Sequence, residues 1–210
     1  MSFADALIEI AVFPLPNVVL FPGAALPLHI FEPRYRVMVK DCLAGHRAIA
    51  IGQSAEDGAI VGGGLIVEHN QLADGRSNIL VVGESRLRLE EVTLEDLPRY
   101  PYRRARAVVL PDLALEVSEK DRTALVAAAS MFAAEVRKHD GSFSFCVPAS
   151  ASAAELADIC AYQLVVDPQV RQAVLEDLDP RSRVDRVTNQ IALQHGAMLR
   201  DAPGSSKVLN

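Results

Sequence analysis

Five histidines and three cysteines are the side chains of this sequence best suited to bind a metal or act as nucleophiles. They are His29, His46, His69, His139, His195, Cys42, Cys146 and Cys160. Zinc sites are recognised by short spacings such as CxxC, HxxxH or HExxH, because one helix or loop presents two ligands together. No such spacing occurs here, and Gly45 is expected to end the helix between Cys42 and His46. The sequence therefore predicts neither a metal nor a cofactor.

A cysteine hydrolase is the enzyme class for which the chain contains candidate catalytic residues. A thiolate nucleophile needs an adjacent histidine and a third group that orients it. Cys146 and His139 lie at or near an expected loop, and Cys42 is a second candidate thiol. Nothing in the sequence indicates that a thiol meets an imidazole, and small buried cysteines are common. The chain has no GxSxG motif, so a serine hydrolase is disfavoured.

Two further stretches could bind phosphate groups. Residues 62–64 are three consecutive glycines, but the Gly-Lys-Ser/Thr triplet of a phosphate loop is missing, so a β-bulge or a close backbone approach is expected instead. Residues 99–106 interleave four arginines with two tyrosines, a pattern found in nucleic-acid-binding surfaces. Acidic residues at 90, 91, 95 and 96 would cancel their field, and the chain has a formal charge of −6. Nucleic acid is therefore disfavoured as a partner, and an RNA-binding protein remains an alternative.

The first third of the chain must fold as short extended pieces, because five prolines and a glycine interrupt its apolar residues 13–43. Residues 18–21 and 25–30 are two such pieces. A helix is expected from Pro33, and its apolar face is formed by Tyr35, Met38, Val39 and Cys42. Off this face, Glu32 is placed to pair with Arg36.

Further strands are predicted at residues 8–13, 48–53, 59–69, 78–82, 86–92 and 102–110, with an Asp-Gly turn at 74–75. The alternation at 86–90 predicts Leu87 and Leu89 in the core and the charged residues in water. About six to eight short strands are typical of a small barrel. From Ser118 onward, helical spacing and N-cap signals predict about four helices, the last with its arginines pointing outward.

Two motifs carry a family resemblance. FPLPNVVLFPG and LPLHIFEPRYRVMVKDCL resemble, in order and spacing, the N-terminal domain of Lon-type ATP-dependent proteases, and in particular small bacterial proteins made of that domain alone. A weaker similarity continues through the DGR and VGESRLRL stretches into the helical half. The resemblance implies an α+β fold, with a PUA-like pseudo-β-barrel lobe at residues 8–112 and a helical bundle lobe at 117–201. It also implies a non-catalytic role in binding protein substrates, since the ATPase and peptidase parts of those proteases have no counterpart here.

The corner between the second extended piece and the first helix admits two interpretations. Structurally, Phe31 would be core and Glu32 would brace the helix. Functionally, the corner would line a groove for an extended peptide, with the ligand in the cleft between the lobes. The candidate peptide-binding residues are His29, Phe31, Glu32, Arg34 and Tyr35.

The expected partners are unfolded or partner polypeptides, within a protease or chaperone system. No apolar run is long enough to span a membrane and the N-terminus lacks a signal-peptide pattern, so a soluble cytoplasmic protein is expected. The oligomeric state does not follow from the sequence.

Overall fold

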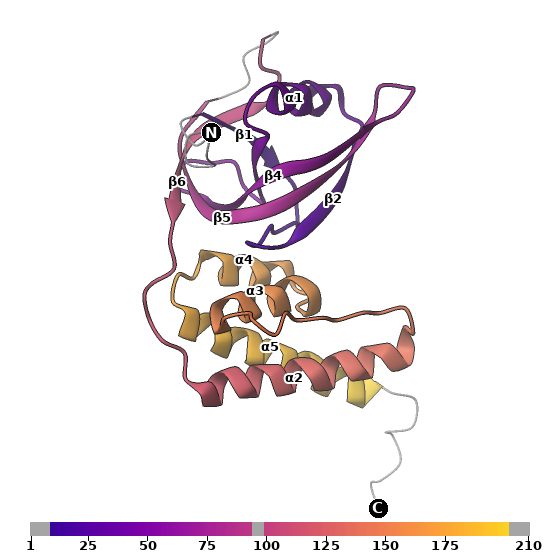
Figure 1. Ribbon diagram of the computed structural model, residues 1–210, viewed down its shortest axis with the longest axis vertical. Coiled ribbons are helices and arrows are strands. Elements are labelled where there is room, and N and C mark those ends of the chain that lie inside the picture. The colour runs from indigo at the N-terminus through magenta and orange to yellow at the C-terminus, as the bar shows by residue number, and fades with distance from the viewer. Residues whose placement is uncertain (1–8, 94–98, 202–210) are drawn as a thin grey trace, which may run out of the picture.

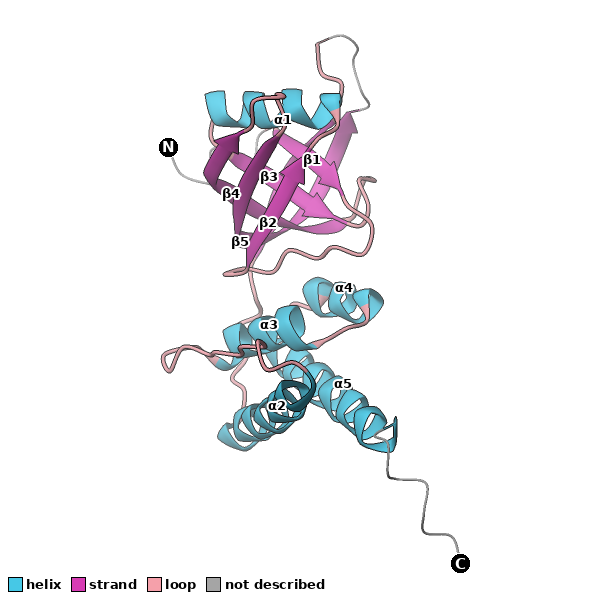
Figure 2. Ribbon diagram, turned by 90° about the vertical axis from the view of Figure 1, so that its right-hand side faces the viewer, coloured by secondary structure: helices cyan, strands magenta, loops and turns pink. Residues whose placement is uncertain are grey.

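A computed structural model describes residues 9–93 and 99–201. Within these ranges, six strands and one helix form a barrel lobe, and four further helices form a helical lobe below it (Figures 1 and 2). The barrel lobe contains β1 (Ile10–Pro14), β2 (Ala25–Ile30), α1 (Pro33–Ala44), β3 (Ala48–Gly52), β4 (Ile60–Gln71), β5 (Ser77–Thr93) and β6 (Arg103–Leu110). The helical lobe contains α2 (Glu119–His139), α3 (Ala153–Leu164), α4 (Pro168–Glu176) and α5 (Pro180–Asp201). The predicted α+β class, with a barrel followed by a helical bundle, is confirmed.

The barrel closes through β5. The strand order is β2-β5-β4-β3-β1-β6, and β6 also pairs with β5. β1 is parallel to β3 and antiparallel to β6, while the other pairings are antiparallel. The sequence predicted two strands, at 78–82 and 86–92, where the structure has the single 17-residue β5. Along one edge its first half pairs with β2 and its second half with β6, while β4 pairs with the other edge.

The glycines of β4 and β5 allow another segment to cross the sheet at contact distance. A Cβ placed on Gly62 would lie 2.0 Å from the carbonyl oxygen of Leu20, and one on Gly83 would lie 2.1 Å from that of Phe21. The predicted bulge is also present, between Gly63 and Gly64. The sequence predicted a strand at residues 18–21, and this prediction is wrong. These residues form a buried irregular segment that packs against the glycines and closes the barrel core.

Helix α1 has the predicted buried face of Tyr35, Met38, Val39 and Cys42. The predicted pairing of Glu32 with Arg36 is wrong, because the Glu32 carboxylate instead accepts a hydrogen bond from Nε of Arg34 at 3.0 Å.

The helical lobe begins each helix with a cap that the sequence encodes. Ser152 and Glu155 form a complete capping box at α3. Asp167 accepts a hydrogen bond from the N–H of Gln169 at α4, and Asp179 accepts one from the N–H of Arg181 at α5. These caps satisfy N–H groups that the first helical turn leaves without partners, which explains why the helix starts were predictable.

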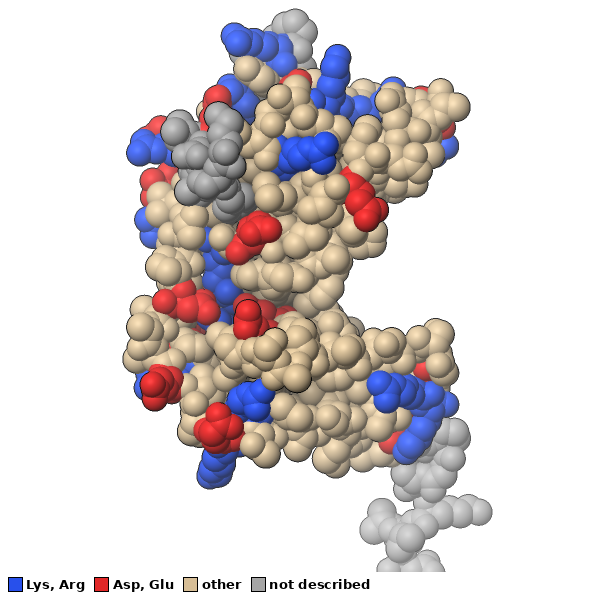
Figure 3. Space-filling view, viewed as in Figure 1, with Lys and Arg blue, Asp and Glu red and all other residues tan. Residues whose placement is uncertain are grey.

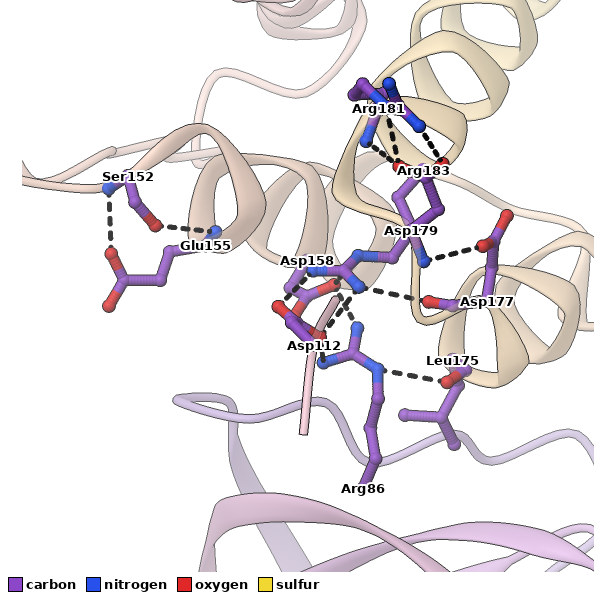
Figure 4. A network of polar contacts seen from close by, with 10 residues as sticks. All are labelled: Arg86, Asp112, Ser152, Glu155, Asp158, Leu175, Asp177, Asp179, Arg181 and Arg183. Carbon is purple, nitrogen blue, oxygen red and sulfur yellow. Dashed lines mark hydrogen bonds and ion pairs between the residues drawn. The ribbon is translucent and has the colours of Figure 1, made fainter. Parts of the chain in front are cut away.

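Two buried arginines join the lobes (Figure 4). Arg86 of β5 donates to the Asp158 carboxylate on α3 at 2.6 Å and to the carbonyl of Leu175 at 3.0 Å. Arg183 of α5 donates two hydrogen bonds to Asp112, at 2.8 and 2.6 Å, and lies 3.4 Å from Asp158. Arg86 and Asp158 are each 4% exposed and Arg183 is fully buried. The expectation that the charged residues of β5 and the arginines of α5 all face water is therefore wrong at these two positions.

Candidate functional site

Strand β2 has a free backbone edge. Among the described residues, it is the one strand hydrogen-bonded to a single neighbour, β5. Successive residues of a strand direct their N–H and C=O groups to alternate sides. Since the N–H of Gly83 donates to the carbonyl of Ala24 at 2.9 Å, the even-numbered residues face β5. Ala25, Pro27 and His29 consequently present their backbone groups at the outer edge.

The two ends of this edge differ. At the end near the helical lobe, the hydroxyl of Tyr162 on α3 donates to the carbonyl of Ala25 at 2.8 Å. Further along, Pro27 offers a carbonyl but no N–H, which limits uncontrolled pairing between strands. His29 offers both groups.

Phe31 follows the free edge and is 59% exposed, so the prediction that it belongs to the core is wrong. Its ring lies 6.2 Å from the ring of His29, nearly parallel to it. The His29 ring is in turn held by Asn78, with 2.7 Å between Nδ1 and the amide oxygen. These two rings form a small aromatic surface at the end of β2.

The other candidate residues lie around the corner from Phe31. Glu32, Arg34 and Tyr35 line a groove of about 510 Å³ together with residues 14–16, 53–56 and 102–103. Arg34 packs over the Tyr35 ring, 4.5 Å from its centroid. Tyr35 is 7% exposed and contacts the ring of Phe13 with centroids 4.2 Å apart, so it supports the groove from below.

The corner and the cleft between the lobes are different places. Figure 3 shows the surface hollowed between the lobes, and the walls visible in this view carry few charged side chains. The corner of residues 29–35 lies instead at the α1 end of the barrel, away from the helical lobe (Figure 2). The free edge of β2 connects the two over a length of roughly 20 Å, given about 3.3 Å per strand residue.

The three cysteines differ in burial. Burial raises the pKa of the Cys42 and Cys160 thiols to about 12, and both side chains lie in the core. Cys146 is exposed, and no hydrogen bond joins it to His139 within the part of the chain that the structure describes. Among the same residues, no three or more His, Cys, Asp or Glu side chains are grouped so that they could hold a metal ion.

We expect a disulfide reagent such as DTNB to modify one thiol of the folded protein at pH 8. Cys146 should react fast because it is exposed, whereas Cys42 and Cys160 remain protonated and out of reach. Replacing Cys146 by serine should abolish the fast phase, and adding guanidinium should release the other two thiols. A fast phase that survives in Cys146→Ser would contradict this assignment.

The arginine cluster of residues 99–106 is largely neutralised by acidic partners. Arg103 contacts Glu56 at 3.2 Å, Arg106 contacts Glu91 at 3.2 Å, and Arg104 pairs with Glu9. The expected neutralisation is thus present, mainly through residues other than those predicted. Glu95 and Asp96 lie outside the described residues.

The whole architecture matches known proteins. The model of the substrate-binding domain of ATP-dependent protease La (Lon) matches residues 9–192. The chain belongs to this family. It is 29% identical to a Lon protease of Roseiflexus castenholzii over 84% of its own length and 23% of that protein, and 26% identical to one of Methylocella silvestris over 90% and 24%. The chain thus spans about a quarter of the length of these relatives.

Solved structures of the same fold include a Lon N-terminal domain protein from Xanthomonas campestris. It has a TM-score of 0.65 and 22% identity, covering 86% of this chain and 97% of that one. The N-terminal domain of Mycobacterium avium complex Lon protease has a TM-score of 0.66 and 14% identity, covering 88% and 98%. None of the described helices is both long and apolar enough to cross a bilayer.

Proposed function

We propose that this Lon substrate-binding-domain protein binds unfolded or extended segments of other polypeptides and does not itself catalyse a reaction. The observation that carries the proposal is the free edge of β2, which runs from the cleft between the lobes to the exposed ring of Phe31. An extended chain that adds to a sheet edge gains main-chain hydrogen bonds of any sequence. Specificity then comes from side chains at alternate positions.

The residues of the corner have distinct roles in this proposal. Pro27 and His29 supply backbone groups, and Phe31 supplies an apolar contact for a side chain of the bound segment. Glu32 and Arg34, paired at 3.0 Å, form a polar rim, while Tyr35 holds Arg34 in place. Folded proteins pair most of their backbone groups within secondary structure and bury most of their large apolar side chains, so a site of this kind favours unfolded chains.

The family relationship suggests the context of binding. The relatives named above are Lon proteases; this chain covers about a quarter of their length and matches the model of the Lon substrate-binding domain. We propose that it delivers or holds polypeptides for a protease or chaperone system in the cytoplasm.

The test measures binding of reduced, carbamidomethylated lysozyme, an unfolded and basic chain, by fluorescence anisotropy. Phe31→Ala should weaken binding about tenfold, as expected for an exposed aromatic anchor. Met131→Ala is the matched control, because Met131 of α2 is 60% exposed, close to the 59% of Phe31. Equal affinities of wild type and Phe31→Ala would remove Phe31 from the site.

A second variant tests the backbone contribution. His29→Pro deletes an N–H that faces away from β5, so the sheet should survive while one edge hydrogen bond to the ligand is lost. A variant that folds normally and binds as wild type does would exclude strand addition at β2.

A further inference from the structure

A second groove lies on the opposite side of α1 from the Glu32–Arg34 corner. It has a volume of about 650 Å³ and runs between α1 and the β4–β5 hairpin, which projects beside α1 in Figure 1. The walls are formed by Pro33, Arg36, Val37, Val39, Lys40, Leu43, His69, Gln71, Gly75 and Ser77. These residues include two cations and an imidazole but no aspartate or glutamate.

The cations of this groove have no acidic partner among the residues that the structure describes. Within the described ranges, neither Arg36 nor Lys40 takes part in an ion pair. Two nearby carboxylates are engaged elsewhere: Asp74 accepts from Nε of Arg76 at 2.6 Å, and Asp41 accepts from the hydroxyl of Tyr102 at 2.8 Å. A third, Glu68, precedes the groove residue His69 on β4, and successive strand residues point to opposite faces.

The position of Arg36 is set by the hairpin turn. Gly75 has a φ of +82°, and a Cβ there would lie 2.0 Å from Nη2 of Arg36. The absence of a side chain at Gly75 lets the guanidinium lie against the turn backbone, at one end of the groove. Lys40 lies one helical turn beyond Arg36 on α1. The two residues are roughly 6 Å apart along the helix axis, at about 1.5 Å per residue.

We propose that this groove binds an acidic, extended polypeptide segment in which carboxylates alternate with apolar residues. Carboxylates two residues apart in an extended chain are separated by roughly 6–7 Å, which matches the spacing of Arg36 and Lys40. A guanidinium and an ammonium then form charge-assisted hydrogen bonds to the carboxylates. The exposed part of Val37 and the side chain of Leu43, on the same helix as the two cations, contact the methylene groups of the carboxylate side chains, while the apolar residues point to the opposite side of the segment.

A polypeptide fits this groove better than a nucleic acid does. Apolar side chains make up four of its ten lining residues, Pro33 included, and none of the ten is a Phe, Tyr or Trp on which a base could stack. The proposed ligand differs in charge from the basic chain used to test β2, so the two surfaces are separable.

The experiment titrates the full chain into a short fluorescein-labelled peptide in which aspartate alternates with leucine. We expect saturable binding, and at least about a tenfold loss of affinity in Arg36→Glu/Lys40→Glu, where attraction becomes repulsion. Lys120→Glu/Lys138→Glu on α2 is the matched control, since it reverses two exposed lysines and changes the net charge equally. It should bind as wild type does.

Further variants and ligands test whether binding is specific to this groove and to acidic peptides. The Phe31→Ala variant should keep full affinity for the acidic peptide, so failure of the β2 site would leave this groove unaffected. A peptide with lysine in place of aspartate should not bind. The milder Arg36→Gln and Lys40→Gln variants, checked for folding by circular dichroism, should each lose part of the affinity. Equal losses in the test and control double variants, or equal binding of a single-stranded oligonucleotide, would overturn the proposal.

Discussion

Replacing Asp158 by alanine is expected to lower the free energy of unfolding by about 3 kcal/mol, the lower end of the range for breaking a buried ion pair, because Arg183 and Arg86 both keep Asp112, at 2.6 and 3.5 Å. Asp158 is the carboxylate that both Arg86 and Arg183 approach, at 2.6 and 3.4 Å. Arginine does not give up its charge inside a protein, so neither guanidinium can adapt by deprotonating. Urea unfolding followed by circular dichroism measures the change.

Glu90→Ala is the appropriate control for this prediction. Glu90 lies on the same strand as Arg86 and pairs with Arg88 at 3.0 Å, but both side chains are exposed to solvent. Its loss should cost less than about 1 kcal/mol. The double variant Arg86→Met/Asp158→Leu should recover part of the stability, because an apolar pair replaces a buried ionic one. If Asp158→Ala is as mild as Glu90→Ala, the buried network does not hold the lobes together.

Gly62→Ala should also be severely destabilising, by about 3 kcal/mol, toward the upper end of the range for overpacked cores. The added methyl carbon would lie 2.0 Å from the carbonyl oxygen of Leu20 and 2.7 Å from its Cβ. Relief requires residues 18–21 to move off the sheet, and these residues seal the core. Thermal unfolding should show the loss directly.

The matched substitution is Gly141→Ala. Gly141 follows α2 and has no atom within 4 Å of an added Cβ. Its replacement should change stability by less than about 0.5 kcal/mol. Similar midpoints for the two alanine variants would show that the 18–21 segment can shift at little cost.

The elements with local signals were predictable from the sequence. The N-caps of α3, α4 and α5 satisfy backbone groups within three residues of themselves, and the buried face of α1 follows from helical periodicity. The glycines of β4 were correctly expected to mark a bulge or a close approach. In each case the structure is determined either by contacts between neighbours in sequence or by the residue type itself, since glycine alone has no side chain.

The predictions that are wrong concern residues whose surroundings are set by distant parts of the chain. Arg86 alternates with the core residues Leu87 and Leu89, so period-two patterning placed it in water, yet the helical lobe covers it there. Phe31 is apolar and was assigned to the core, but the strand that precedes it lies at the margin of the sheet. Neither outcome has a local signal, because each depends on how the lobes pack and on which strand remains unpaired.

The candidate site was predictable only in part. The corner of residues 29–35 was identified through the family resemblance, and the structure separates it into an aromatic surface at Phe31 and a groove at Arg34. The groove between α1 and the hairpin had no sequence signal. Its cations come from a helix and its opposite wall from a strand some thirty residues later.

The closing of the barrel has a consequence for synthesis on the ribosome. β1 is the first strand of the sheet, yet one of its two neighbours is β6, the last strand. A nascent chain therefore exposes one side of β1 until residues 103–110 have left the exit tunnel. Pauses in translation before that point would prolong the exposure of an aggregation-prone strand. Pauses after that point would occur when the barrel can already be complete.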